Sequence, residues 1–391
     1  MVERDWSSDV CSSDLDRLGD LAGAEAATAK LLEEAPDDAE AIDVVLEGAF
    51  PDDATSELLA VAQAALVERL VSDPLQPELV DRLARVAMVL ENAPLRQATL
   101  GALVAVGEGT PEIDRELEIL DERVAHLPQI AIDQAALPDL CDPDDVGPVG
   151  DVLALAAPCI GEALGPSLTG LGATRKQRVD PRAGLPLRNE VAAWAGALGL
   201  GEFELYVGGA DEGGVFGIAG ERPTLLVGPR VSMPLSPAHR QLVARELFAL
   251  RRGVTVLRHR EPADVAAIVV ALCRLVSVEI PSPQYALLAE FERQLGRVLP
   301  RKLRKPLADA AVRIRDEGHD PRAWIAAATA SLDRLAAIAA GDASHVLAAT
   351  PATRGRLAST LEARQRAARL LSFVLSPSYL ALREQLGMGV R

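Results

Sequence analysis

Residues 187–253 contain an ordered series of apolar segments and turn residues that constrains the fold more than any other part of the chain. We expect one helix and three short strands here, over 187–199, 203–207, 214–218 and 224–227. Ser236 and Pro237 predict the start of a second helix, because serine caps free N–H groups and proline has none to lose. Gly253 should end that helix. The segment predicts an α+β domain with a small strand meander.

The chain beyond Gly253 is expected to be almost wholly helical. Hydrophobic residues make up 49% of the sequence and aromatic residues only 3%, so the core must consist mainly of Ala, Leu and Val. Short side chains of this kind favour closely packed helices. We expect helices over 262–276, 283–298, 303–316, 321–340, 353–374 and 378–386.

Two stretches of this half carry a resemblance to a known family. Residues 205–228 read LYVGGADEGGVFGIAGERPTLLVG, and residues 236–253 read SPAHRQLVARELFALRRG. Their order resembles that of the gluzincin metallopeptidases of the CAAX-prenyl-protease and heat-shock membrane-protease type. The resemblance implies a zincin-like domain over 187–391, in which the second stretch forms the helix that bears an H-E-x-x-H motif.

The residues at the motif positions do not suit zinc chemistry. In H-E-x-x-H the two histidines ligate zinc and the glutamate acts as general base on the metal-bound water. Arg245 stands at the first histidine position and has no acceptor lone pair. Ala249 stands at the second and has no ligand atom. Glu246 remains, but without a metal it has little to activate.

The resemblance also locates a third ligand position. In that family a ligand glutamate lies four residues before an aspartate on a later helix. The best counterpart here is the segment TASLDRLAAIAAGD, in which Asp333 matches the aspartate and Thr329 falls at the glutamate position. All three ligand positions, Arg245, Ala249 and Thr329, therefore hold residues that do not serve as ligands.

We expect a non-catalytic protein with no cofactor and no metal, which acts as a protein–protein interaction scaffold. The alternative is a zinc-dependent endopeptidase with unrecognised metal ligands and Glu246 as general base. An unrelated α+β domain also remains open for this half, because a few short strands followed by an apolar helix are common.

The front half, residues 16–140, is similar to tetratricopeptide repeats. The stretch GDLAGAEAATAKLLEEAPDDAEAID at 19–43 resembles the second helix of such a repeat with its junction. Similar junctions recur at Pro36, Pro77 and Pro111, which are 41 and 34 residues apart. Leu59, Ala62, Leu66 and Leu70 fall on one helical face, as do Leu79, Leu83, Val86 and Leu90. We expect an α-solenoid of helix pairs that binds a protein or peptide partner, with an ordinary helical bundle as the alternative.

Charge divides the chain into two parts. Residues 1–150 hold 34 acidic and 9 basic side chains, and the remainder holds 23 acidic and 31 basic ones, for a net charge of −17. The densest basic stretch contains Arg297, Arg301, Lys302, Arg304 and Lys305. It predicts a solvated helix junction, a surface that docks with the acidic half, or an anion-binding site. Without interleaved aromatic residues it does not predict binding to nucleic acid.

The remaining features bear on boundaries and location. Residues 4–15, RDWSSDVCSSDL, resemble a translated sequencing adapter, so we set 1–15 apart as an artefactual tail. The proline- and aspartate-rich stretch 137–150 predicts the boundary between halves, with a linker and connecting helix over 141–186. Cys11, Cys141, Cys159 and Cys273 are widely spaced and predict buried, reduced thiols. With no uninterrupted apolar run of 18 residues, we expect no membrane span and a cytoplasmic protein.

Overall fold

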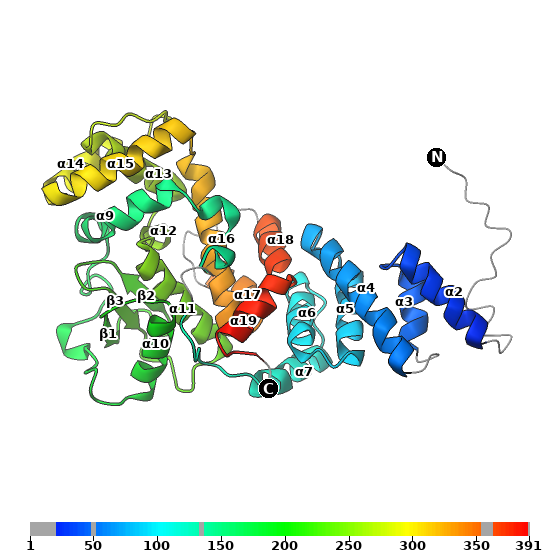
Figure 1. Ribbon diagram of the computed structural model, residues 1–391. Coiled ribbons are helices and arrows are strands. Elements are labelled where there is room, and N and C mark those ends of the chain that lie inside the picture. Colours follow the sequence, from blue (N-terminus) through cyan, green and yellow to red (C-terminus); the bar gives the residue numbers. More distant parts are fainter. Residues whose placement is uncertain (1–20, 48–51, 133–136, 353–362, 390–391) are drawn as a thin grey trace. The chain divides into compact units, whose positions relative to one another are not determined.

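The computed structural model describes residues 21–47, 52–132, 137–352 and 363–389. Within these ranges the chain is mainly helical and contains one three-stranded sheet, which confirms the expected mainly α fold class (Figure 1). Contacts group the chain into two compact units, Met1–Leu120 and Asp121–Arg391, here named unit 1 and unit 2. The suspected adapter tail lies outside the described residues.

The described residues of unit 1 are mostly helical. The helices are α2 (Leu21–Glu34), α3 (Ala39–Leu46), α4 (Asp52–Ser72), α5 (Pro77–Val89), α6 (Ala93–Val106) and α7 (Pro111–Glu122), whose last two residues belong to unit 2. From α2 to α6 each helix packs on the next one, and α2 and α3 also contact the helix after that. The three junction prolines lie where the sequence predicted: Pro36 is between α2 and α3, and Pro77 and Pro111 begin helices.

The predicted apolar faces of unit 1 are buried. Leu59, Ala62, Leu66 and Leu70 all lie on one face of α4 and are fully inaccessible to solvent. In the second predicted set Leu79, Leu83 and Val86 are buried on α5, while Leu90, which follows the last residue of that helix, is half-buried. The helical period read from the sequence therefore identifies the faces that form the core of this unit.

The first part of unit 2 contains α-helices, two short 3-10 helices labelled η, and the three strands of the sheet. In chain order these are α8 (Leu137–Leu140), η1 (Pro143–Asp145), α9 (Pro148–Leu164), η2 (Arg175–Gln177), α10 (Pro186–Ala197), β1 (Glu204–Val207), β2 (Val215–Ile218) and β3 (Thr224–Val227). Contacts divide the chain at Leu120 and Asp121, ahead of the stretch 137–150 where composition placed the boundary.

Helices make up the rest of unit 2. They are α11 (Pro237–Arg252), α12 (Val256–His259), α13 (Pro262–Leu275), α14 (Leu288–Val298), α15 (Arg301–Glu317), α16 (Pro321–Ala340), α17 (Ser344–Ala352), α18 (Ala363–Val374) and α19 (Pro377–Gln385). Helices α12 and α17 were not expected. The expected helix 353–374 corresponds to α18, and its first ten positions lie outside the described residues.

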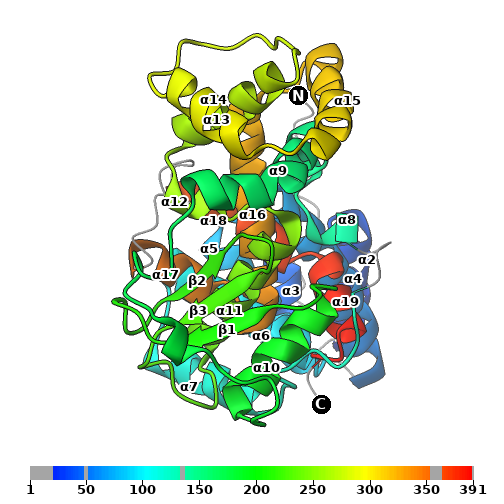
Figure 2. The same cartoon turned by 90° about the vertical axis from the view of Figure 1, so that its left-hand side faces the viewer.

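The sheet is not the meander that the sequence suggested. Its strand order is β1-β3-β2, in which β2 pairs antiparallel with β3 while β1 pairs parallel with β3 on its other side (Figure 2). The burial pattern gives the physical reason. All four residues of β3 are buried, as expected for a central strand covered on both faces, whereas β1 and β2 are only partly buried. The continuous run TLLV was therefore the signal for a central strand.

Helices α11 and α16 form the centre of unit 2. Both have the bounds that the sequence predicted: Ser236 caps α11 by accepting from the His239 N–H, and Gly253 ends it in the left-handed region at φ 71°. Helix α16 packs on α11, α13, α17 and α18. By length and composition alone α16 could cross a membrane, but 83% of its apolar window is buried inside the protein, as in a core helix.

Candidate functional site

The four residues at the ligand and aspartate positions come from the two central helices. Arg245 and Ala249 lie one turn apart on α11, and Thr329 and Asp333 lie one turn apart on α16. Each is 6% exposed or less. Because α11 packs directly on α16, the structure brings the two pairs into one buried region of unit 2.

A cluster of two arginines and one aspartate occupies this region, and we call it the Asp333 cluster. The Arg245 guanidinium donates to Oδ1 of Asp333. Arg366 of α18 donates from Nε to Oδ2 at 2.6 Å and from Nη2 to Oδ1 at 2.8 Å. All three side chains are buried. Arg366 was not predicted from the sequence.

The charges in the Asp333 cluster favour the ionised form of the carboxylate. Burial by itself raises the pKa of Asp333, but the Arg245 and Arg366 guanidiniums outweigh it and hold that pKa below its ordinary value. Burial likewise lowers the pKa of Arg366, and Asp333 raises it above the usual range. The cluster therefore holds two cations and one anion away from water.

The other ligand positions offer no metal donors. The Thr329 hydroxyl donates to the Ile325 carbonyl of its own helix at 2.9 Å, and Ala249 carries no heteroatom. Both oxygens of Asp333 accept hydrogen bonds from guanidiniums. A cation entering here would meet the positive charges of Arg245 and Arg366. The residues present thus do not fit a zinc ion.

Glu246, the residue at the general-base position, holds two elements together. Its Oε2 accepts from the Gly217 N–H of β2 at 2.8 Å, and its Oε1 accepts from Arg258 of α12. The Glu246 side chain is 3% exposed. The Arg258 guanidinium also lies over the Phe216 ring, 4.3 Å from its centroid. Glu246 thereby satisfies an N–H of an edge strand that would otherwise be unpaired.

A second buried cluster surrounds Asp145 of η1. Its carboxylate accepts from Arg252 of α11, with one Nη2–Oδ1 distance of 2.8 Å, and from the Ser331 hydroxyl of α16. Trp324 donates to the Asp145 carbonyl at 2.9 Å. Burial lowers the pKa of Arg252, and the hydrogen bond that its guanidinium donates to Asp145 raises that pKa above the usual range. The sequence does not reveal this cluster, because the run DPDD at 142–145 is typical of a linker.

Among the described cysteines, Cys141 lies beside the Asp145 cluster, where its thiol interacts with Ser331, Arg252 and Asp145. Cys141, Cys159 and Cys273 are buried free thiols, as predicted, and burial raises the pKa of Cys273 to about 12. His239 is half-buried, with Nδ1 3.0 Å from the Ser236 hydroxyl. Across the described ranges, no three His, Cys, Asp or Glu side chains are placed to hold a metal ion.

The predicted basic stretch forms an exposed corner between α14 and α15. Its members, Arg297, Arg301, Lys302, Arg304 and Lys305, are all exposed, and four of them lie in the first five residues of α15. Arg304 Nη1 lies 3.5 Å from the Leu275 carbonyl. Anion binding at this corner stays a prediction.

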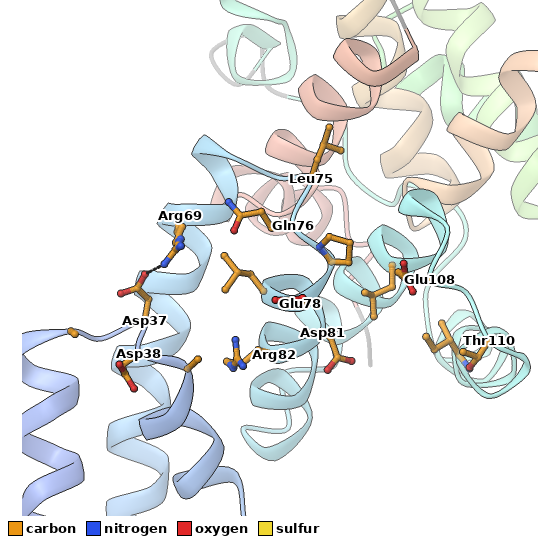
Figure 3. A pocket seen from close by; sticks show the side chains of 16 residues that line it. Asp37, Asp38, Arg69, Leu75, Gln76, Glu78, Asp81, Arg82, Glu108 and Thr110 are labelled. Carbon is orange, nitrogen blue, oxygen red and sulfur yellow. Dashed lines mark hydrogen bonds and ion pairs between the residues drawn. The ribbon is translucent and has the colours of Figure 1, made fainter. Parts of the chain in front are cut away.

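Unit 1 contains a groove that the sequence did not reveal. Its volume is about 1180 Å³, and its walls come from the ends and turns of α2 to α7. The charged residues that line it are Asp37, Asp38, Arg69, Glu78, Asp81, Arg82 and Glu108. Figure 3 shows Asp37 paired with Arg69 on one side of the groove and Glu78, Asp81 and Glu108 facing them. The acidic composition of this half was the one sequence signal for it.

No family model, curated protein or solved structure matches this chain. Any conclusion about its function therefore rests on the geometry and chemistry of its own residues.

Proposed function

We propose that the protein is a non-catalytic interaction scaffold, in which a solenoid of tetratricopeptide-like helix pairs is followed by a zincin-like domain without a metal centre. The Asp333 cluster is the observation that carries this proposal. Arg245 stands where the resembled family has its first zinc ligand, and it binds the aspartate that the resemblance had singled out. A fixed guanidinium charge takes the place of a metal cation.

The chemistry of Glu246 supports a structural rather than a catalytic role. A general base must hold a lone pair toward the water or substrate proton that it removes. Both oxygens of Glu246 already accept from Gly217 and Arg258, and the side chain is shielded from solvent. The glutamate therefore contributes to the packing of α11 against β2 and α12.

The arrangement of unit 1 supports the scaffold half of the proposal. Helices α2 to α6 pack in chain order, each on the next, as expected when neighbouring helix pairs stack to cover each other's apolar faces. The groove beside their turns is large enough to receive a segment of another chain. Binding of a partner, rather than chemistry on a substrate, is the activity that these features support.

Metal analysis of the purified full chain tests the proposal. After incubation with zinc and desalting, we expect the protein to retain well below one zinc atom per chain. We also expect its peptidase activity to be no higher than that of the Glu246→Gln variant. Stoichiometric zinc together with peptidase activity that Glu246→Gln removes would overturn the proposal. The variant Arg245→His/Ala249→His/Thr329→Glu restores the three ligands that the resemblance implies. A folded variant that binds one zinc supports the zincin-like geometry, and a folded variant that binds none contradicts it.

A further inference from the structure

We propose that the groove of unit 1 binds an extended cationic segment of a partner protein, with lysine or arginine side chains spaced around an apolar one. The proposal rests on the scaffold function above and names the chemistry of the partner. Three properties of the groove support the proposal. They are the pairing of its arginines with carboxylates of the same unit, the carboxylates that remain unpaired, and the apolar floor between these carboxylates.

The first property is the charge that remains after internal pairing. Residues 21–120 hold 21 acidic and 6 basic side chains. Arg69 binds Asp37 at the groove, and Arg82 binds Asp43 at 3.3 Å. Both groove arginines are therefore already engaged by carboxylates of the same unit, so neither is left to attract an anionic ligand.

The second property is the position of the remaining carboxylates. Glu78, Asp81 and Glu108 line the groove and are exposed, and in the described part of the chain no ion pair involves them. Glu78 and Asp81 project from neighbouring turns of α5, and Glu108 lies just after the end of α6 (Figure 3). A ligand in the groove meets these three unneutralised negative charges and that of Asp38, the N-cap residue of α3, and together they favour lysine and arginine and repel acidic segments.

The third property is the apolar surface between these charges. Leu79 and Leu103 are 7% and 3% exposed, and Leu75 and Ile113 are half-buried, so they present an apolar floor. An apolar side chain of the ligand placed there would lose contact with water. The combination of an apolar floor and acidic walls selects a mixed segment over a uniformly charged one.

Binding of designed peptides to the full chain tests the proposal. The probe is a fluorescein-labelled peptide of about ten residues, roughly 33 Å when extended, in which lysine and alanine alternate around a central leucine. Matched peptides carry glutamate or glutamine at each lysine. We expect the anisotropy to rise only with the lysine peptide. The affinity should fall as salt increases from about 50 to 200 mM.

Two charge-matched variants locate the binding. Glu78→Gln/Asp81→Asn/Glu108→Gln removes the three exposed negative charges of the groove, and Glu57→Gln/Glu68→Gln/Glu118→Gln removes as many exposed charges outside the groove. We expect the first variant to bind the lysine peptide about tenfold more weakly, which corresponds to about 1.4 kcal/mol. The affinity of the second variant for the lysine peptide should stay within about twofold of that of the unmodified protein. Circular dichroism checks that both fold.

The other outcomes overturn the proposal. Equal weakening in both variants indicates attraction by net charge alone, and equal binding of the glutamate or glutamine peptide contradicts the charge argument. Self-association that the groove variant abolishes would assign the groove to a second copy of the chain. If the groove binds the glutamine peptide best, its preference for cationic segments is contradicted but the scaffold function is not. Zinc-dependent cleavage would instead contradict the scaffold function, whichever peptide the groove binds.

Discussion

Arg245 of α11 forms a buried ion pair with Asp333 of α16, although 88 residues separate them in the sequence. The pair joins the two central helices of unit 2, and Arg366 of α18 donates to both oxygens of the same carboxylate. These three side chains therefore connect three helices of the core.

Removal of the Asp333 charge should destabilise unit 2 strongly. Asp333→Asn removes the anion to which the buried guanidiniums of Arg245 and Arg366 both bind, and breaking a buried pair in this way costs about 3–5 kcal/mol. Urea unfolding followed by circular dichroism measures the loss. The control Asp139→Asn changes an exposed carboxylate and should stay within about 0.5 kcal/mol of the unmodified protein. Equal stabilities for the two variants would contradict a structural role for the Asp333 cluster.

Replacement of the whole cluster should be tolerated better than removal of its anion. Arg245→Met/Asp333→Leu/Arg366→Met removes all three charges of the cluster together, and apolar replacements of buried ion pairs are often neutral or stabilising by about 1–4 kcal/mol. We expect a free energy of unfolding at least equal to that of the unmodified protein. A triple variant less stable than Asp333→Asn would show that the helices depend on the hydrogen-bond geometry itself.

The Asp333 cluster also predicts how stability depends on pH. The folded-state pKa of Asp333 is depressed, so the cluster stabilises the fold above the ordinary aspartate pKa of 3.8, and this contribution is lost as pH falls through the folded-state value. The difference in unfolding free energy between the unmodified protein and Asp333→Asn should stay constant from pH 7 to about 5 and shrink below about 4. A difference that already shrinks between pH 7 and 6 would contradict the ionisation assigned to Asp333.

Local sequence signals predicted much of the fold, because helix ends are set by short-range chemistry. Ser236 and Gly253 define the two ends of α11, and Asp320 and Gly341 do the same for α16. The order of the strands depends on pairing between segments distant in the sequence. Nothing local to β1 specifies that it lies beside β3 rather than β2, although the full burial of β3 was encoded in its apolar run.

The candidate site was predictable only where the resemblance supplied an alignment. Arg245, Glu246 and Asp333 were located from their positions relative to the motif. Their partners were not, because Arg366 lies 33 residues after Asp333 and Arg258 lies 12 residues after Glu246, with no periodicity that relates them. The role of such arginines depends on which helices pack together, and a single sequence does not contain that information.

Glu246 should contribute to stability rather than to catalysis. Glu246→Gln removes the charge that Arg258 pairs with in a site only a few per cent exposed, so we expect a loss of about 2–3 kcal/mol in urea unfolding. Glu279→Gln, at an exposed glutamate of the same unit, should change stability by less than about 0.5 kcal/mol. A Glu246→Gln protein as stable as the control would mean that the carboxylate is not needed for packing and would reopen its assignment as a base.

Two glycines with the same backbone conformation should respond differently to alanine. Gly253 and Gly318 end α11 and α15 with φ values of 71° and 70°, so a Cβ costs each about 1–2 kcal/mol of backbone strain. At Gly253 that Cβ would also lie 2.8 Å from Ala154 Cα and Ala157 Cβ on α9, whereas at Gly318 it would meet nothing within 4 Å. We therefore expect Gly253→Ala to cost about 1–3 kcal/mol more than Gly318→Ala, the usual range for overpacking. Thermal and urea unfolding of the two variants measure this difference. Equal losses would mean that α9 moves away freely and that its contact with the end of α11 contributes little to unit 2.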